Sequence, residues 1–301
     1  MNGIINVLKP PGMTSHDVVS FIRKTLNIKK VGHTGTLDPN AAGVLPICIG
    51  KATRIVPYFD EFTKIYIAEL TLGFETDTQD KYGRIIGTAN VPNITYSELK
   101  NVLDSFQGSI KQVPPMYSAL KHNGKKLYEL AREGITIERQ QREVFIHDIL
   151  LLKSYENKRI LFQVECSKGT YIRTLCSDIG RKLGTMGCMT FLLRTRVGDF
   201  DIKNTYTIEE IQECARSNRL DSIIIPLDKA LEHYDCVNLN KNYYAILKNG
   251  GRVVLNSCIN DFKLDDLEKR IRVYCDSEFV GIGIVKRNGY DMVLKMDKVF
   301  V

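Results

Sequence analysis

The segment from residue 31 to residue 50 constrains the fold of this chain more than any other. It reads VGHTGTLDPNAAGVLPICIG. Its glycines and prolines disfavour a continuous helix or strand through the whole segment. They are Gly32, Gly35, Pro39, Gly43 and Pro46. We therefore expect a loop. Its only acid is Asp38 and its only imidazole is His33.

Asp38 has two interpretations. An aspartate before a proline commonly initiates a turn, so local backbone structure alone can explain this residue. A carboxylate in a rigid loop with no other charged side chain before Lys51 is also a candidate catalytic group, because functional groups concentrate in loops held by a scaffold. The residue types alone leave both interpretations open.

The bulk properties indicate a globular protein with room for two domains. The chain has 301 residues, of which 44% are hydrophobic and 26% charged. No apolar run approaches 18 residues and the N-terminus does not resemble a signal peptide, so we expect no membrane span and a cytoplasmic location. A net charge of +7 is compatible with a nucleic-acid partner but does not require one. The cysteines show no zinc-binding spacing, which predicts no metal and free thiols at positions 48, 166, 176, 188, 214, 236, 258 and 275.

Helix and strand signals are interspersed along most of the chain. Three helix starts carry the capping-box spacing: Thr14 with Asp17, Thr95 with Glu98, and Thr207 with Glu210. The spacing of apolar residues predicts a further helix over 171–183 and strands over 65–72, 144–152 and 159–166. Because these elements follow no regular βαβ period, the predicted fold class is α+β.

The pattern of the sequence changes after about Asp235, from mixed helix and strand signals to strand signals. Short strand-like runs follow at 252–255, 271–275, 279–285 and 291–296, separated by Asn, Gly and Asp turns. This spacing predicts a small all-β barrel or sandwich over residues 236–301, after a larger domain over 1–235. The pattern of the last strands resembles a PUA domain, an RNA-binding module.

The string Gly-His-Thr-Gly-Thr-Leu-Asp-Pro-x-Ala-x-Gly-Val-Leu-Pro, over residues 32–46, resembles the signature of the bacterial tRNA pseudouridine-55 synthases. Separate blocks extend this resemblance over most of residues 1–235. It implies a mixed or antiparallel central sheet flanked by helices and loops, and isomerisation of uridine 55 in the T loop of tRNA, on a flipped-out base and without a cofactor. The chain departs from the family pattern at Leu8, usually Asp, and at 185–189, where Thr-Met-Gly-Cys-Met replaces the usual Gly-Ala-His or Gly-Ala-Tyr.

The resemblance assigns catalytic roles to three residues. The essential aspartate of the family corresponds to Asp38, a tyrosine stacked on the target base to Tyr66, and an arginine paired with the aspartate to Arg173. It further implies that Asp80 helps to orient this arginine and that Leu192 forms an apolar wall of the pocket. From the residues alone, Tyr66 is explained as a core residue of its strand, and Arg173 as an arginine that reaches solvent from a helix edge.

RNA contacts are expected from His33, from Lys9 in the loop beside the catalytic loop, and from Lys121 and Lys168. Lys121 begins a basic insertion, about residues 121–142, in which cationic side chains alternate with aromatic rings. A solvated basic helix explains this segment, and so do phosphate and base contacts with folded RNA, which the resemblance favours. The expected partner is the T arm of tRNA, bound by a monomer with no obligatory protein partner.

Two other functions compete with this interpretation. One is a catalytically silent protein that binds or folds tRNA on the same scaffold. The other is a guide-RNA-dependent relative that works inside a protein complex. The presence of Asp38, Tyr66 and Arg173 argues against the first, and a basic insertion without lysine-rich tails argues against the second.

Overall fold

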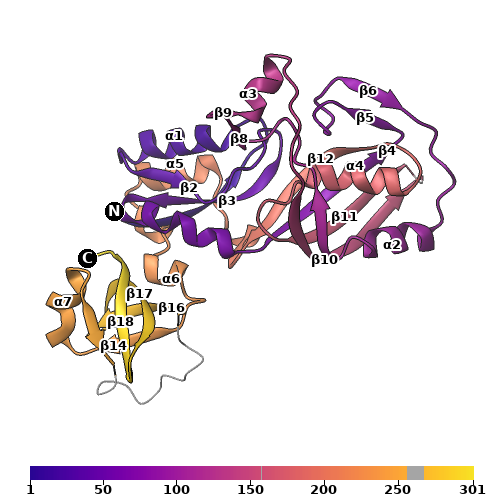
Figure 1. Cartoon of the computed structure of the whole chain (residues 1–301). Helices are drawn as coiled ribbons and strands as arrows, with labels where there is room; N and C mark the ends of the chain where they lie inside the picture. Colours follow the sequence, from indigo (N-terminus) through magenta and orange to yellow (C-terminus); the bar gives the residue numbers. More distant parts are fainter. Residues whose placement is uncertain (157, 256–267) are drawn as a thin grey trace.

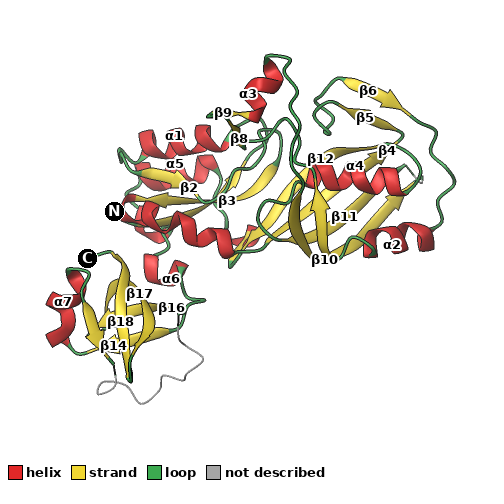
Figure 2. Cartoon of the chain, viewed as in Figure 1, coloured by secondary structure: helices red, strands yellow, loops and turns green. Residues whose placement is uncertain are grey.

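The computed structural model describes residues 1–156, 158–255 and 268–301 of the chain. Most of its strands form one large sheet and, near the C-terminus, one smaller sheet, and β5–β6 and β8–β9 are separate two-stranded hairpins (Figure 1). Helices and long loops surround the large sheet, as Figure 2 shows. The α+β class and the central sheet flanked by helices and loops are therefore confirmed.

The large sheet is mixed. Its strands follow the order β1-β3-β12-β4-β11-β10-β7, with β2 paired to β3 and β13 to β12. Along this order all neighbours are antiparallel except β3 and β12, which run parallel. The strand bounds are Gly3–Lys9 (β1), Val31–His33 (β2), Ala42–Ile49 (β3), Lys64–Leu72 (β4), Gly108–Gln112 (β7), Arg142–Tyr155 (β10), Arg159–Cys166 (β11), Gly187–Val197 (β12) and Phe200–Asp201 (β13).

The predicted helix starts are present. Helices α1 (Ser15–Thr25), α2 (Tyr96–Asp104) and α5 (Ile208–Arg216) each begin after the expected threonine, with both hydrogen bonds of the capping box formed. Helix α4 (Ile172–Lys182) occupies the segment predicted from apolar spacing. It packs on the alternating apolar face of β4, while α2 packs beside it on β10, and Ala68 and Leu70 are fully buried in the main core that these elements share.

The expectation of a loop through residues 31–50 is correct for 34–41 and wrong for 31–33 and 42–49, which form β2 and β3. Gly43 is required in this strand, because a β-carbon there would lie 2.1 Å from the carbonyl oxygen of Arg194 in β12. Pro46 lies between the part of β3 that pairs with β12 and the part that pairs with β2. A residue without an N–H is tolerated on that edge, since no neighbouring strand pairs with it there.

The smaller sheet has the order β14-β16-β17-β18-β15 and a core of its own. Its strands are Cys236–Leu239 (β14), Arg252–Val254 (β15), Arg270–Cys275 (β16), Glu278–Asn288 (β17) and Asp291–Val299 (β18). It begins at Cys236, where the sequence pattern changes to short strand-like runs. That residues 236–301 form a separable domain stays a prediction. It contacts the 3-10 segment η1 (Gly50–Glu61), where the Tyr58 hydroxyl donates to Asp297 Oδ2 at 2.6 Å and Lys51 Nζ to the Phe300 carbonyl at 2.8 Å.

Shorter elements connect these units. They are β5 (Phe74–Thr76), β6 (Ile85–Thr88), β8 (Lys121–His122), β9 (Lys125–Lys126), α3 (Leu127–Arg132), η2 (Ile202–Asn204), η3 (Leu220–Ser222), α6 (Leu227–Ala230), η4 (Lys241–Tyr243) and α7 (Tyr244–Lys248). None of the helices in the described ranges combines the length and apolar character needed to cross a membrane. The predicted free thiols are present and mostly buried, although Cys236 is exposed and Cys258 lies outside the described residues.

Candidate active site

The loop between β2 and β3 presents Asp38. The Ala41 N–H donates to the Asp38 carbonyl at 3.1 Å, so the backbone forms the turn that the Asp-Pro pair predicts. The hydroxyl of the buried Ser15 bonds both the N–H (2.9 Å) and the carbonyl (3.2 Å) of Leu37 and fixes the residue before Asp38. The turn and the presented carboxylate are thus both present in one loop.

Arg173 forms a bidentate ion pair with Asp38. Its Nε lies 2.9 Å from Asp38 Oδ2, and its Nη2 donates to Oδ1 at 3.2 Å. The guanidinium also donates to the carbonyls of Thr78 (3.0 Å) and Tyr117 (2.8 Å). Its side chain is 6% exposed, whereas that of Asp38 is 36% exposed. The predicted pair is therefore present, with the arginine enclosed by protein and the carboxylate open on one side.

The first turn of α4 positions this arginine. Gln112, at the end of β7, accepts the Tyr171 N–H at 3.0 Å and donates to the Tyr171 carbonyl at 3.3 Å. Gln112 is buried, so these bonds fix the residue that precedes the helix. Arg173 follows two residues later and points into the protein instead of reaching solvent.

Tyr66 and Leu192 form apolar surface beside this loop. Both are buried and belong to the same cluster as Leu37 and Ala41, which flank Asp38 in the sequence. Burial raises the pKa of the Tyr66 hydroxyl, and the nearby Arg194 guanidinium acts in the opposite direction. The core interpretation of Tyr66 thus holds for its strand face, and the same packing places its ring at the loop that carries Asp38.

Asp80 acts on Arg173 through a turn. Its Oδ1 accepts the Thr78 hydroxyl at 2.8 Å and the Tyr82 N–H at 3.0 Å. The Thr78 carbonyl in turn accepts a hydrogen bond from Arg173. Asp80 is therefore linked to Arg173 only through the backbone of this turn, and its orienting role stays a prediction.

Lys9 lies in an environment that the sequence did not predict. Its ammonium donates to the carbonyls of Pro10 (2.8 Å), Met13 (2.6 Å) and Pro39 (2.9 Å), and the residue is fully buried. Burial lowers its pKa to about 8, opposed by the charge of Asp38. This environment favours a role in holding the loop around Pro39, in place of the direct RNA contact expected from the sequence.

His33 ends β2 and packs edge-on against His16, with ring centroids 5.3 Å apart. Burial, with smaller effects from His16 and Arg194, lowers its pKa to about 4. Its ring is therefore neutral at physiological pH, and its buried Nδ1 has no partner among the described residues.

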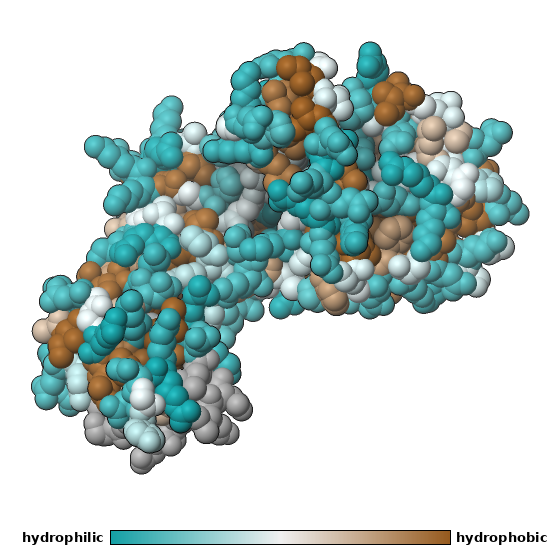
Figure 3. Space-filling view, in the orientation of Figure 1, coloured by the Kyte–Doolittle hydropathy of each residue, from teal (hydrophilic) through white to brown (hydrophobic). Residues whose placement is uncertain are grey.

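Lys121 and Lys168 are exposed and lie apart from the Asp38–Arg173 pair in the hydrogen-bond network. Lys121 begins the hairpin β8–β9, which leads into α3 and projects from the body of the molecule (Figure 1). Lys168 forms an exposed ion pair with Asp60 at 3.4 Å. Figure 3 shows a largely polar surface on the face in view, with separate apolar patches. RNA contacts of both lysines stay predictions.

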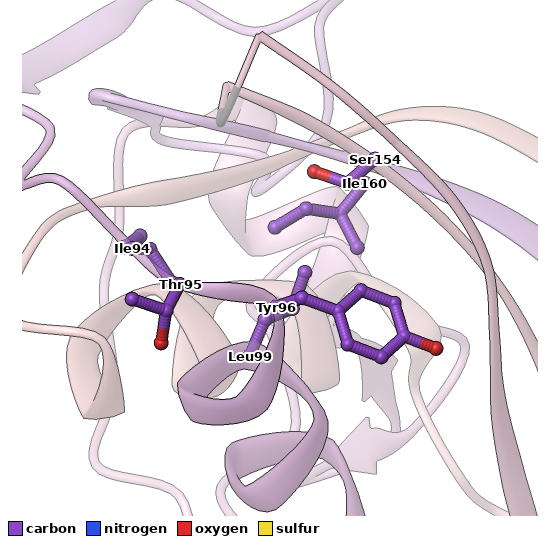
Figure 4. A pocket seen from close by; sticks show the side chains of 6 residues that line it. All are labelled: Ile94, Thr95, Tyr96, Leu99, Ser154 and Ile160. Carbon is purple, nitrogen blue, oxygen red and sulfur yellow. The ribbon is translucent and has the colours of Figure 1, made fainter.

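Two cavities can be placed relative to this site. A cavity of about 60 Å³ lies at the start of α2 (Figure 4), and its lining residues are Ile94, Thr95, Tyr96, Leu99, Ser154 and Ile160. None of them is a predicted site residue. A larger cavity of about 350 Å³ is lined by Gln79 and Thr174, the sequence neighbours of Thr78 and Arg173, together with the cationic Lys111, Arg139 and Arg181.

The sequence interpretation missed Arg194 as a site residue. This arginine is fully buried, and its guanidinium contacts the loop that carries Asp38. A signal was available: residues i and i+2 of a strand share a face, so the assignment of Leu192 to the pocket wall places Arg194 on the same side.

Comparisons with known proteins agree with this geometry. The profile described as "TruB family pseudouridylate synthase (N terminal domain)" matches residues 23–172, and "tRNA pseudouridylate synthase B C-terminal domain" matches 173–232. A protein of Alkaliphilus oremlandii named tRNA pseudouridine synthase B is 50% identical over 97% of this chain and 95% of its own length. Its namesake in Clostridioides difficile is 45% identical over the full length of both chains.

Two solved structures have a similar fold. One titled as a Cbf5-Nop10-Gar1 complex matches with a TM-score of 0.77 and 28% identity, over 99% of this chain and 85% of the other. An H/ACA RNP bound to a substrate RNA containing 2'-deoxyuridine matches with a TM-score of 0.76 and 26% identity, over the same shares. The resemblance drawn from the sequence is confirmed, and this chain belongs to the TruB family of pseudouridylate synthases.

Proposed function

We propose that this protein isomerises one uridine of tRNA, at position 55 in the T loop, to pseudouridine. The observation that carries the proposal is the two-pronged contact between the enclosed Arg173 and the partly open Asp38, on a loop flanked by the apolar surface of Tyr66 and Leu192. The name shared by relatives that are 43–55% identical supports tRNA as the substrate.

The chemistry matches these residues. The bond from ribose C1′ to base N1 breaks, the base turns, and C1′ bonds to C5. The proton on C5 leaves, and N1 gains one from solvent. No electrons or groups pass to a second molecule, so the reaction requires no cofactor. It does require a carboxylate that can attack C1′, attack C6 or remove a ribose proton, and each of these routes begins with Asp38 ionised.

Arg173 keeps Asp38 ready for this step. Enclosing a carboxylate beside a bound base disfavours its charged form, and an adjacent guanidinium counteracts that effect. The planar fork also fixes the direction of the carboxylate, because its two nitrogens contact both oxygens. The hydrogen bonds from Arg173 to Thr78 and Tyr117 hold the fork itself in place.

The apolar neighbours suit a flipped-out base. A nucleotide taken out of the stack loses its neighbours, and aromatic or apolar side chains replace them in enzymes that act on bases. Tyr66 supplies a ring and Leu192 an aliphatic surface in the cluster that includes Leu37. The tyrosine hydroxyl is in addition a candidate acceptor for the C5 proton, directly or through water.

Cationic surfaces around the site fit the rest of the substrate. We propose that the T arm contacts the projecting segment that begins at Lys121, the neutral ring of His33, and Lys168 once its exposed ion pair opens. Phosphate contacts of this kind give affinity and fix the register of the protein on the RNA. In this proposal the protein acts in the cytoplasm as a monomer, with neither a guide RNA nor an obligatory protein partner.

The experiment is incubation with an unmodified tRNA transcript carrying tritium at uridine C5. Loss of the C5 proton releases tritium, and chemical mapping locates the product. We expect release of one tritium per tRNA, with pseudouridine at position 55, and none from a matched transcript carrying cytidine there. Binding of tRNA without tritium release would favour a silent RNA-binding protein, and release only with added guide RNA would favour the guide-dependent relative.

A further inference from the structure

Arg194 lies in β12, which is placed between β4, the strand that carries Tyr66, and β3, the strand that follows the Asp38 loop. In β12 it is the cross-strand neighbour of Tyr66 in β4 and, on the other side, of Gly43 in β3. The β3 backbone approaches so closely that no β-carbon fits at Gly43. The strand that sets the position of Tyr66 therefore also sets the end of the loop that carries Asp38.

The guanidinium of Arg194 contacts that loop at both ends. Its Nη2 donates to the Gly35 carbonyl at 3.3 Å and its Nη1 to the Thr36 carbonyl at 3.5 Å, both ahead of Asp38. Its Nε donates to the Val44 carbonyl at 2.8 Å, beyond Asp38. All three acceptors are backbone carbonyls, so the side chain ties together the two ends of the segment.

The burial of Arg194 excludes direct contact with RNA. The residue is 1% exposed, and it is the largest fully buried side chain among the described residues. Burying a cation costs free energy unless hydrogen bonds or an opposite charge compensate for the lost water, and arginine stays protonated in proteins. Three of its hydrogen bonds go to the segment that presents Asp38, and its guanidinium also interacts with the Tyr66 hydroxyl. A role in packing alone would be served at lower cost by an apolar side chain.

We propose that Arg194 is a positioning residue, which holds the Gly35 to Val44 segment so that Asp38 meets Arg173 beside Tyr66. The inference rests on the proposed function, because its effect is on the rate of isomerisation. Lys9 holds the same loop at Pro39, between the Arg194 contacts. The charge of Arg194 also acts on Tyr66, since it counteracts the effect of burial on that hydroxyl.

The test compares Arg194→Lys with Arg196→Lys. Lysine at 194 keeps the charge but cannot span three carbonyls, because it lacks the planar fork. Arg196 lies two residues farther along β12, is exposed, and donates to the Gly198 carbonyl at 2.7 Å, so it controls for the loss of one arginine from this strand. Single-turnover tritium release, with enzyme in saturating excess over tRNA, gives the rate constant. Circular dichroism gives the folded fraction, and filter binding gives the tRNA affinity.

For Arg194→Lys we expect a rate constant lowered by roughly 100-fold, the size of effect that a misplacement of about 1 Å produces. The folded fraction and the tRNA affinity stay within about threefold of wild type, since the side chain does not reach the surface. A merely structural role would lower the folded fraction and would leave the rate constant unchanged. Arg196→Lys is expected to change the rate constant by less than about threefold.

Three outcomes overturn the proposal. One is a rate constant for Arg194→Lys within about threefold of wild type, and another is an equal loss in Arg196→Lys. If Arg194→Lys does not fold, Arg194→Gln, which keeps two donors without the charge, replaces it with the same expected loss of rate. Failure of both to fold would assign Arg194 to folding alone. A wild-type protein that releases no tritium would instead refute the proposed function.

Discussion

Arg173→Lys is the substitution that most sharply separates chemistry from substrate binding. The arginine contacts both oxygens of Asp38 and the carbonyls of Thr78 and Tyr117. Lysine keeps one positive charge near this place, but its ammonium is a point donor and cannot reproduce the planar fork. The substitution therefore removes geometry and leaves the charge.

The size of the loss follows from the contacts. A hydrogen bond to a charged group contributes about 1.5–3 kcal/mol, and lysine forfeits at least one prong to the carboxylate. If that prong is needed in the transition state, the rate falls by roughly 10- to 150-fold, at about 1.4 kcal/mol for each factor of ten. Affinity for tRNA should change little, because the arginine side chain is almost fully enclosed by protein.

Single-turnover tritium release, with enzyme in saturating excess over tRNA, measures the rate, and filter binding measures the affinity. Arg181→Lys is a suitable control, because Arg181 lies on the same helix, is exposed, and forms ion pairs with Glu75 and Asp178. Its rate should stay within about threefold of wild type. A rate for Arg173→Lys within threefold of wild type, or a loss that appears only in affinity, would refute the role assigned to the fork.

Three further perturbations test other parts of the site. Tyr66→Phe should bind tRNA almost normally, whereas Tyr66→Ala should lose ~1–3 kcal/mol of stacking, and equal binding by the two variants would contradict the stacking role. Deletion of 236–301 should weaken tRNA binding and its salt dependence, while turnover at saturating tRNA stays within about tenfold if circular dichroism shows a folded protein; a folded but inactive truncation would show that this segment completes the site. The pKa of His33 is lowered to about 4, so stability attributable to its neutral form should be lost as the pH falls from about 6.5 towards 4, because the unfolded state takes up the proton first. Urea unfolding measures the free energy of unfolding at pH 7 and at pH 4.5. Between these two pH values His33→Gln should lose about 1–3 kcal/mol less of it than the wild type does, and an equal loss in both proteins would exclude this account of the ring.

Local rules predicted the regular elements well. The capping boxes at Thr14, Thr95 and Thr207 are present, because the capping residue and its acid lie within one turn and need no distant partner. Alternation likewise predicted β4, whose inward face includes Tyr66. Strand β3 escaped prediction, since Gly43 is explained only by the approach of β12, which lies about 150 residues away in the sequence.

The site residues likewise divide into those that short motifs identified and those whose surroundings depend on distant segments. Short motifs with family resemblance identified Asp38, Arg173 and Tyr66, and the structure brings the first two into contact. The environments of Lys9 and Arg194 were beyond such motifs, because both cations donate hydrogen bonds to backbone carbonyls that lie far away in the sequence, at Pro39 for Lys9 and at Gly35 and Val44 for Arg194. A basic residue near an expected RNA site is naturally assigned to phosphate, and only burial shows that it holds a loop.

The measurement that tests the central claim most directly is turnover by Asp38→Asn on the tritiated transcript, together with tRNA binding. Asparagine keeps the shape of the side chain and removes its charge and nucleophilicity. The account predicts tritium release at the level of a sample without enzyme, with tRNA affinity within a few-fold of wild type and pseudouridine at position 55 only in the wild-type reaction. More than a few per cent of wild-type turnover in Asp38→Asn would contradict it.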